Sequence, residues 1–251
     1  RFVETLLEKN SLEEAKRSNF DFKNKTHLLS YIAKRMVEED IYEMSKVYMY
    51  QVGQEYFKHT GLRDQTQTQI DNFIASKIFV EKGGFIRFRY RAFLEYFVAL
   101  AMFQNKEFRG MVLSDEHYLS FPNEIEYYAA IARDDVELLD LIGERFAKLT
   151  DRVKTVTQWQ ANLNDLDNLV PPHKGEREYE FKALEEQLKA PPLTKNERDE
   201  LLEAELPKDV GGRQDVFRPF FEEDGSRWNV CLFLYSGVIR NSELVSDEKT
   251  R

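Results

Sequence analysis

The sequence is poor in cysteine, glycine and proline, and it has no long apolar run. Cys231 is the only cysteine, so this sequence can form neither an intrachain disulfide nor a cysteine-built zinc site, which favours a reducing compartment. The 11 Gly and 7 Pro among 251 residues are few for a turn-rich β fold and favour helices. No stretch approaches the roughly 18 apolar residues that span a bilayer, and no signal-peptide pattern occurs. We therefore expect a mainly α-helical cytoplasmic protein without a membrane partner.

Residues for two common kinds of chemistry are also missing. A phosphate-binding P-loop ends in Gly-Lys, and this dipeptide occurs nowhere in the sequence. The four histidines, His27, His59, His117 and His173, include no His-Glu-x-x-His sequence and no pair four residues apart. We expect no catalytic residue, no metal site and no cofactor held by this chain itself.

Acidic side chains outnumber basic ones, with 45 Asp and Glu against 36 Lys and Arg, and the formal net charge is −9. Nucleic-acid binders usually carry a basic field, so this balance argues against a nucleic-acid partner. The 19 Phe and 12 Tyr predict an aromatic-rich core. The length suits one large domain or two small ones.

Helical periodicity dominates the first third of the chain. Residues 1–17 have a helical pattern without a start methionine, so we expect the chain to continue a longer protein. Apolar residues then recur at helical spacing in a segment that contains Leu28, Leu29, Ile32, Ala33, Met36 and Val37. A second helix is predicted from about Met44 to His59, ending at Gly61, and Asp64 can cap a third from Thr66 to Ser76.

The period then changes to that of β-strands. Residues 78–80 and 85–89 are β-prone runs joined by the turn 81–84, which contains Gly83-Gly84, and this pattern predicts a β-hairpin. A helix from Tyr90 to about Gln104 is apolar nearly all round and should be buried. Three helices followed by a two-stranded wing is the order of a winged helix.

These patterns divide the chain into five parts. We expect the end of a preceding helical subdomain over 1–24, a winged-helix domain over 25–106 and a helical domain over 107–163. A charged linker with exposed helices is predicted over 164–225, where Pro-Pro and Gly-Gly pairs accompany dense charge. The segment 226–251 is predicted to be helical again, with Val230, Phe233, Leu234 and Val238 on its apolar side.

The segment Gly84–Phe103, GFIRFRYRAFLEYFVALAMF, resembles the end of the winged helix in STAND-type P-loop ATPases of the NACHT kind. Their wing leads into a helix that reads Phe-x-His-x-x-Phe-x-Glu-Tyr-Phe-x-Ala. The matching residues here are Phe88, Phe93, Glu95, Tyr96, Phe97 and Ala99. Tyr90 stands where the family has a histidine that approaches the β-phosphate of bound ADP.

The resemblance implies a larger, nucleotide-switched protein. An ATPase core that binds ATP or ADP with Mg²⁺, and an effector domain, would precede this chain. A sensor region or an invader-derived protein would be a partner, and activation would form a homo-oligomer. Bacterial relatives commonly act in defence against phage, so the resemblance implies a regulatory and sensor-linking role in such a signalling ATPase.

Three sets of residues are candidates for function. Tyr90 is a candidate nucleotide contact through a neutral hydrogen bond. Glu95 is a carboxylate in an apolar helix and must find a partner, so it either makes a structural hydrogen bond or ion pair or forms an interdomain contact that breaks on activation. Arg87, Arg89 and Arg91 form a basic cluster that either faces phosphate or pairs with nearby carboxylates.

Two other functions remain open from the sequence. The chain could be a helical protein-interaction module without any link to nucleotide. It could also be a winged-helix protein that binds nucleic acid, in which case binding should depend on salt.

Overall fold

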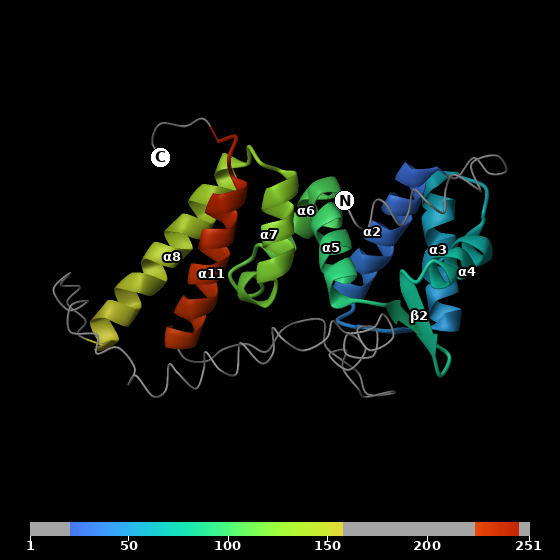
Figure 1. Ribbon diagram of the computed structural model, residues 1–251, viewed down its shortest axis with the longest axis horizontal. Coiled ribbons are helices and arrows are strands. Elements are labelled where there is room, and N and C mark those ends of the chain that lie inside the picture. The colour runs from blue at the N-terminus through green and yellow to red at the C-terminus, as the bar shows by residue number, and fades with distance from the viewer. Residues whose placement is uncertain (1–20, 158–223, 246–251) are drawn as a thin grey trace, which may run out of the picture.

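The computed structural model describes residues 21–157 and 224–245, and helices predominate among them. Figure 1 shows the helices following one another along the long axis, with α8 and α11 at one end and α3 and α4 at the other. The helices are α2 (Phe22–Glu38), α3 (Lys46–Thr60), α4 (Thr66–Ala75), α5 (Arg91–Gln104), α6 (Lys106–Val112), α7 (Pro122–Ile131), α8 (Val136–Thr157) and α11 (Asp224–Asn241), with a 3-10 turn at Tyr118–Ser120. The predicted fold class, mainly α with a short hairpin, is confirmed. The predictions for 1–17 and for most of 164–225 lie outside the described residues.

The three predicted helices before the hairpin are present. The Asp21 side chain caps α2 by accepting a hydrogen bond from the backbone N–H of Asn24 at 2.9 Å, and all six predicted stripe residues of α2 are fully buried. The helix α3 ends at Gly61, whose φ of 68° is the left-handed conformation that glycine adopts without strain. At the start of α4, Asp64 accepts from the backbone N–H of Thr66 at 2.9 Å, although Gln65 occupies the N-cap position itself.

A small antiparallel sheet lies beside α3. The predicted hairpin is formed by β2 (Phe79–Lys82) and β3 (Phe85–Phe88), and Gly83 and Gly84 between them both have positive φ, as a tight hairpin turn requires. A third strand, β1 (Met44–Ser45), pairs with the other edge of β3, with Met44 opposite Ile86. The helix predicted from about Met44 begins at Lys46, because Met44 and Ser45 form this strand, which the sequence analysis missed, and Ser45 caps α3 by accepting from the backbone N–H of Tyr48.

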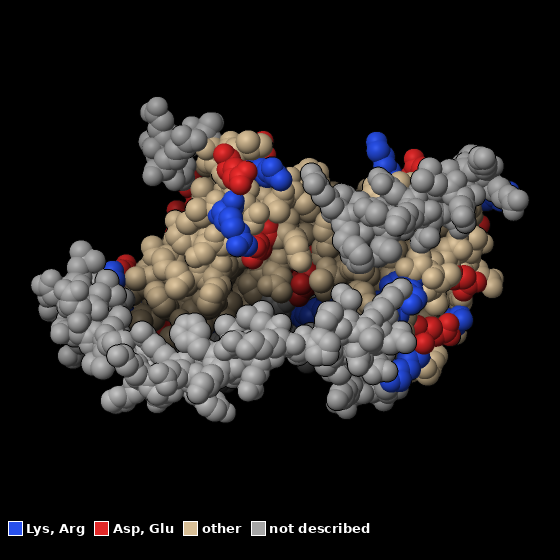
Figure 2. All heavy atoms as spheres, in the orientation of Figure 1, with Lys and Arg blue, Asp and Glu red and all other residues tan. Residues whose placement is uncertain are grey.

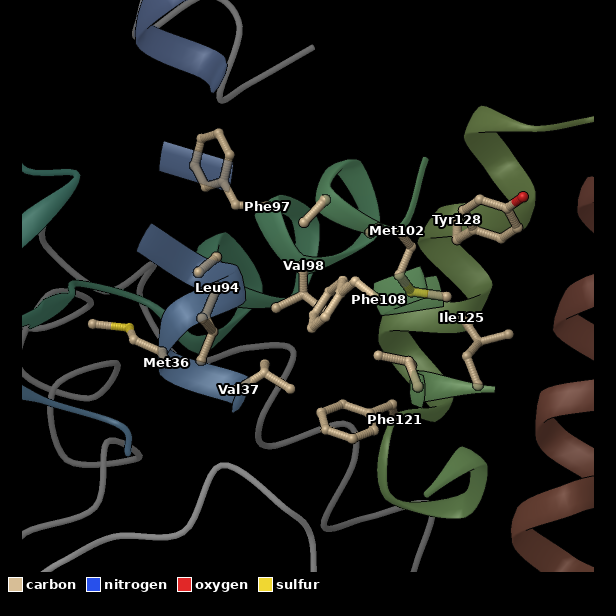
Figure 3. Close-up of a cluster of buried hydrophobic side chains, with 14 of the residues drawn as sticks. Met36, Val37, Leu94, Phe97, Val98, Met102, Phe108, Phe121, Ile125 and Tyr128 are labelled. Atoms are coloured by element: carbon tan, nitrogen blue, oxygen red, sulfur yellow. The ribbon is translucent and has the colours of Figure 1, made fainter. Parts of the chain in front are cut away.

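The helix α5 lies in the middle of the molecule. It packs against α2 on one side and α7 on the other. Figure 3 shows Leu94, Val98 and Met102 of α5 between side chains of α2 and those of α6 and α7. The predicted burial of α5 is confirmed for most of its length, but Phe103 is 57% exposed, although Met102 beside it is fully buried. Phe103 lies on the same face as the exposed Ala92 and the partly buried Tyr96, so one face of α5 is left uncovered.

The last helix returns to the end of the molecule where α8 lies. Trp228 donates a hydrogen bond to the Thr150 hydroxyl at 2.9 Å, and Phe146 of α8 stacks on Tyr235 of α11. These contacts and Figure 1 show that α11 runs antiparallel to α8, so residues 157 and 224 lie at the same end of the pair. Leu234 and Val238 are buried as predicted, but Phe233 is 77% exposed, so its predicted place on the apolar side was wrong. None of the described helices is long and apolar enough to cross a bilayer.

Candidate functional site

The candidate residues gather where β3 passes into α5. Tyr90 is the N-cap residue of α5, with extended backbone and a half-buried side chain. Its hydroxyl accepts a hydrogen bond from Nε of Arg89 at 3.1 Å, and its ring packs edge-on against Phe93 with centroids 5.1 Å apart. The side chain of Tyr90 is therefore held at the strand–helix junction by its contacts with Arg89 and Phe93.

The three arginines of the basic cluster each have a partner within the chain. Arg87 forms an ion pair with Glu43 at 3.5 Å, and both side chains are nearly buried, with 12% and 11% exposed. Arg89 bonds to Tyr90, as described above. Arg91 lies 3.4 Å from a carboxylate oxygen of Glu95, one helical turn further along α5. The geometry thus favours carboxylate and tyrosine partners for these arginines over a free phosphate-facing surface.

Glu95 is buried at 5% exposure and joins two helices. Its Oε1 accepts a hydrogen bond from Nδ2 of Asn123 at 3.0 Å, and Asn123 belongs to α7. The guanidinium of Arg91 supplies the compensating charge from the solvent side, with 32% of its side chain exposed. A carboxylate in an apolar helix needs such partners, because burying a charge without them costs several kcal/mol.

Tyr42 is part of this site and was missed by the sequence analysis. It is 2% exposed, and the guanidinium carbon of Arg91 lies 6.0 Å from the centroid of its ring. Burial raises the pKa of Tyr42 to about 12, although Arg91 and Arg87 lower it and Glu95 raises it. The hydroxyl makes no hydrogen bond within the part of the chain that the structure describes. No periodic pattern distinguishes a tyrosine in a short loop, so the sequence offered no signal for it.

The charges around the junction are largely compensated. Each guanidinium faces a carboxylate or a phenol, and no group of three or more His, Cys, Asp and Glu that could hold a metal ion occurs among the described residues. Figure 2 shows that, in several places on the visible face of the molecule, basic side chains lie beside acidic ones. The hydrogen bond between Glu95 and Asn123 links α5 to α7.

The fold and this junction define a mainly α-helical module built around a largely buried central helix, whose Glu95 is hydrogen-bonded to Asn123 of α7. Residues 42–98 match the family model described as Novel STAND NTPase 4, so this part of the chain is related to the STAND NTPases. The match runs from Tyr42 through the sheet and into α5, and it includes Glu95. Comparison with curated proteins and with solved structures gave no match.

Proposed function

We propose that residues 25–106 form a winged helix and that the chain is the regulatory and sensor-linking region of a STAND-type signalling ATPase. The order helix, strand, helix, helix, strand, strand from α2 to β3, with β3 central in the sheet, supports the winged helix. The family match over 42–98 supports the link to a STAND NTPase. The NACHT kind is the subgroup that the Phe88-to-Ala99 motif favours.

The central position of α5 carries this proposal. The matched segment ends inside α5, and the far side of the same helix packs on α7. Glu95 lies within the matched segment, whereas its partner Asn123 lies outside it. Because close-packed helices transmit displacement as rigid bodies, a shift of α5 at Tyr90 would move α7.

The partners and cofactors in this proposal belong to the parent protein. ATP or ADP with Mg²⁺ would bind to an ATPase core that supplies the Gly-Lys missing here. Tyr90 would lie at the seam with that core. An effector domain, a sensor region or invader-derived trigger, homo-oligomerisation and a cytoplasmic role in defence against phage complete the proposal, and the resemblance of the segment after the wing supports them.

A nucleic-acid-binding winged helix receives less support. In a helix-turn-helix arrangement the second helix enters the major groove, and here that helix is α4. Its sequence, TQTQIDNFIA, has no Lys or Arg and contains Asp71. Phosphate contacts need cations, so this helix would bind the duplex poorly.

A protein-interaction module is the second candidate, and one observation favours it. Three large apolar side chains of the C-terminal segment are exposed: Phe233 at 77%, Ile239 at 50% and Leu244 at 64%. Such side chains are a common feature of protein contact surfaces. This candidate differs from the first in needing no nucleotide.

Hydrogen–deuterium exchange on the parent protein tests the leading proposal. We expect exchange in α7 to differ between the ADP-bound state and the state with a non-hydrolysable ATP analogue. Asn123→Ala should reduce the difference in α7 and leave the difference in 42–98, since it removes the tie to Glu95. Asn229→Ala, an exposed asparagine on α11, is the matched control and should change nothing. Equal exchange of α7 in both states would contradict the proposal.

A further inference from the structure

A basic pocket lies between the middle of α8, the first turn of α11 and the segment of Asp115 and Tyr118, away from the junction at α5. Its volume is about 370 Å³, within the range of small-ligand sites. Four cationic side chains line it: Arg145, Lys148, Arg152 and Arg227. The acidic residues of its lining are Asp115 and Glu144. In a protein with a net charge of −9, this is a local excess of positive charge.

Arg145 is the anchored cation of this pocket. Its Nη2 lies 2.7 Å from a carboxylate oxygen of Asp115, and its guanidinium carbon lies 4.4 Å from the centroid of the Tyr118 ring. Only 12% of the side chain is exposed. A guanidinium held on an aromatic face by an ion pair has already lost much of its rotamer freedom, so it would bind an anion at a lower entropic cost.

Lys148 and Arg152 are the exposed cations. They follow Arg145 by three and seven residues in α8, so all three side chains project from one face of the helix. Within residues 21–157 and 224–245, neither Lys148 nor Arg152 has an ion pair. Arg227 faces them from α11. Two helices thus direct cations toward one space, and two of those cations have no counter-ion in the described chain.

Tyr118 of the pocket lining and Cys231, which contacts it, are both uncharged at neutral pH. Tyr118 is buried, and burial raises its pKa to about 12. Cys231 beside it is fully buried, and burial raises the pKa of its thiol to about 11. Both groups therefore keep their protons and do not compensate the cations.

We propose that this pocket binds a small phosphate-bearing ligand. Arginine offers a planar pair of donors that matches phosphate oxygens, and a lysine adds a point charge. A ligand with two or more negative charges would compensate Lys148 and Arg152 together, whereas a single carboxylate would leave one of them unpaired. The pocket's volume fits a free phosphate compound better than a nucleic-acid backbone. This site is independent of the function proposed above, because it shares no residue with the α5 junction.

Calorimetric titration of the 251-residue chain with inorganic pyrophosphate tests the proposal. The double variant Lys148→Gln/Arg152→Gln should bind at least about tenfold more weakly, since hydrogen bonds to charged groups carry this much affinity. The matched control is Lys58→Gln/Arg63→Gln, which removes two exposed cations at the other end of the molecule and should leave binding unchanged. Thermal unfolding of each variant without ligand verifies folding.

The outcomes separate the possible ligands. Binding of ADP and pyrophosphate, but not of adenosine, with equal sensitivity to Lys148→Gln/Arg152→Gln identifies the phosphate as the recognised group. Much tighter binding of ADP than of pyrophosphate would assign the pocket to a nucleotide. Absence of pyrophosphate binding, or an equal loss in both double variants, would overturn the proposal, since the second result indicates only diffuse attraction by surface charge.

Discussion

Phe88 at the end of β3 stacks on Phe97 in the middle of α5, with ring centroids 5.6 Å apart and ring planes 26° apart. This contact attaches the sheet to the central helix. Both rings are essentially inaccessible to solvent. The loss of one of them would leave a cavity at the point where the sheet and α5 meet.

Phe97→Ala should lower the free energy of unfolding by about 3–5 kcal/mol, because it removes buried apolar surface and leaves a cavity. Urea denaturation followed by circular dichroism measures this change. Phe103→Ala on the same helix is the control and should cost less than about 1 kcal/mol, since that ring is 57% exposed. Similar losses for the two variants would contradict the burial of Phe97.

Glu95→Ala should destabilise the protein by about 1–3 kcal/mol, because it leaves the Asn123 amide and the Arg91 guanidinium without their shared partner. Glu95→Gln keeps an oxygen that accepts from Asn123 and should cost less. Denaturant midpoints of the two variants give the comparison. If Glu95→Gln is the more damaging change, the hydrogen bond to Asn123 is not what holds this side chain.

Two glycines should respond to alanine with opposite signs. Gly84 has a φ of 81° in the hairpin turn, so Gly84→Ala should cost about 1–2 kcal/mol from backbone strain alone. Gly110 lies inside α6 with open space where a Cβ would point, so Gly110→Ala should stabilise by about 0.4–1 kcal/mol. Thermal unfolding of both variants tests the pair, and a stabilising Gly84→Ala would contradict the turn geometry.

The stability of the protein should fall as pH rises above about 8.5, where an unfolded cysteine begins to ionise. Burial raises the pKa of Cys231 to about 11, so between these values the folded state keeps a proton that the unfolded state loses. The contribution of Cys231 to the free energy of unfolding should be constant below this window and decline through it. Urea denaturation at several pH values up to 9.5 measures the decline, and Cys231→Ala should make it shallower, leaving the part due to buried tyrosines such as Tyr42 and Tyr118. An unchanged slope in Cys231→Ala would contradict the assignment to the thiol.

Tyr90→His should slow ADP release from the parent protein if Tyr90 faces the phosphates there. A charged imidazolium contributes roughly 1.5–3 kcal/mol, against about 0.5–1.5 kcal/mol for a neutral phenol. Tyr90→Phe should change release by a factor of about 10 or less. ADP dissociation and melting temperature are measured together. A lower melting temperature with unchanged ADP release for Tyr90→His would show a packing residue that bonds to Arg89 and packs on Phe93.

Elements with a repeating pattern were predictable from the sequence. The stripe from Leu28 to Val37 and the apolar rows of α5 repeat over several turns, and the Gly83-Gly84 turn has a specific chemical requirement. The two-residue strand β1 was not predictable, because Met44 and Ser45 are too few to show a period and their pairing with β3 is tertiary. Phe233 was placed wrongly because the sequence does not show which part of the surface of α11 other helices cover.

The candidate site was predicted only as separate residues. Glu95 was identifiable because a carboxylate in an apolar helix needs a partner, but its partner Asn123 lies 28 positions away on another helix. The pairing of Arg87 with Glu43 likewise depends on β1 adding to the sheet, which the sequence did not reveal. Long-range polar pairs of this kind follow from the packing of elements and not from local spacing.

The antiparallel pairing of α8 and α11 also makes the chain a candidate for two-fragment complementation. Residues 157 and 224 leave the described structure at the same end of this pair, and α11 is held by buried Leu234 and Val238 and by the Trp228 bond to Thr150. A cut between positions 157 and 224 would therefore not separate the helices at once, because their contacts do not need the connecting chain. The cut protein would reassemble from two pieces with a concentration dependence that the intact chain lacks, and that dependence would measure how firmly the last helix is docked.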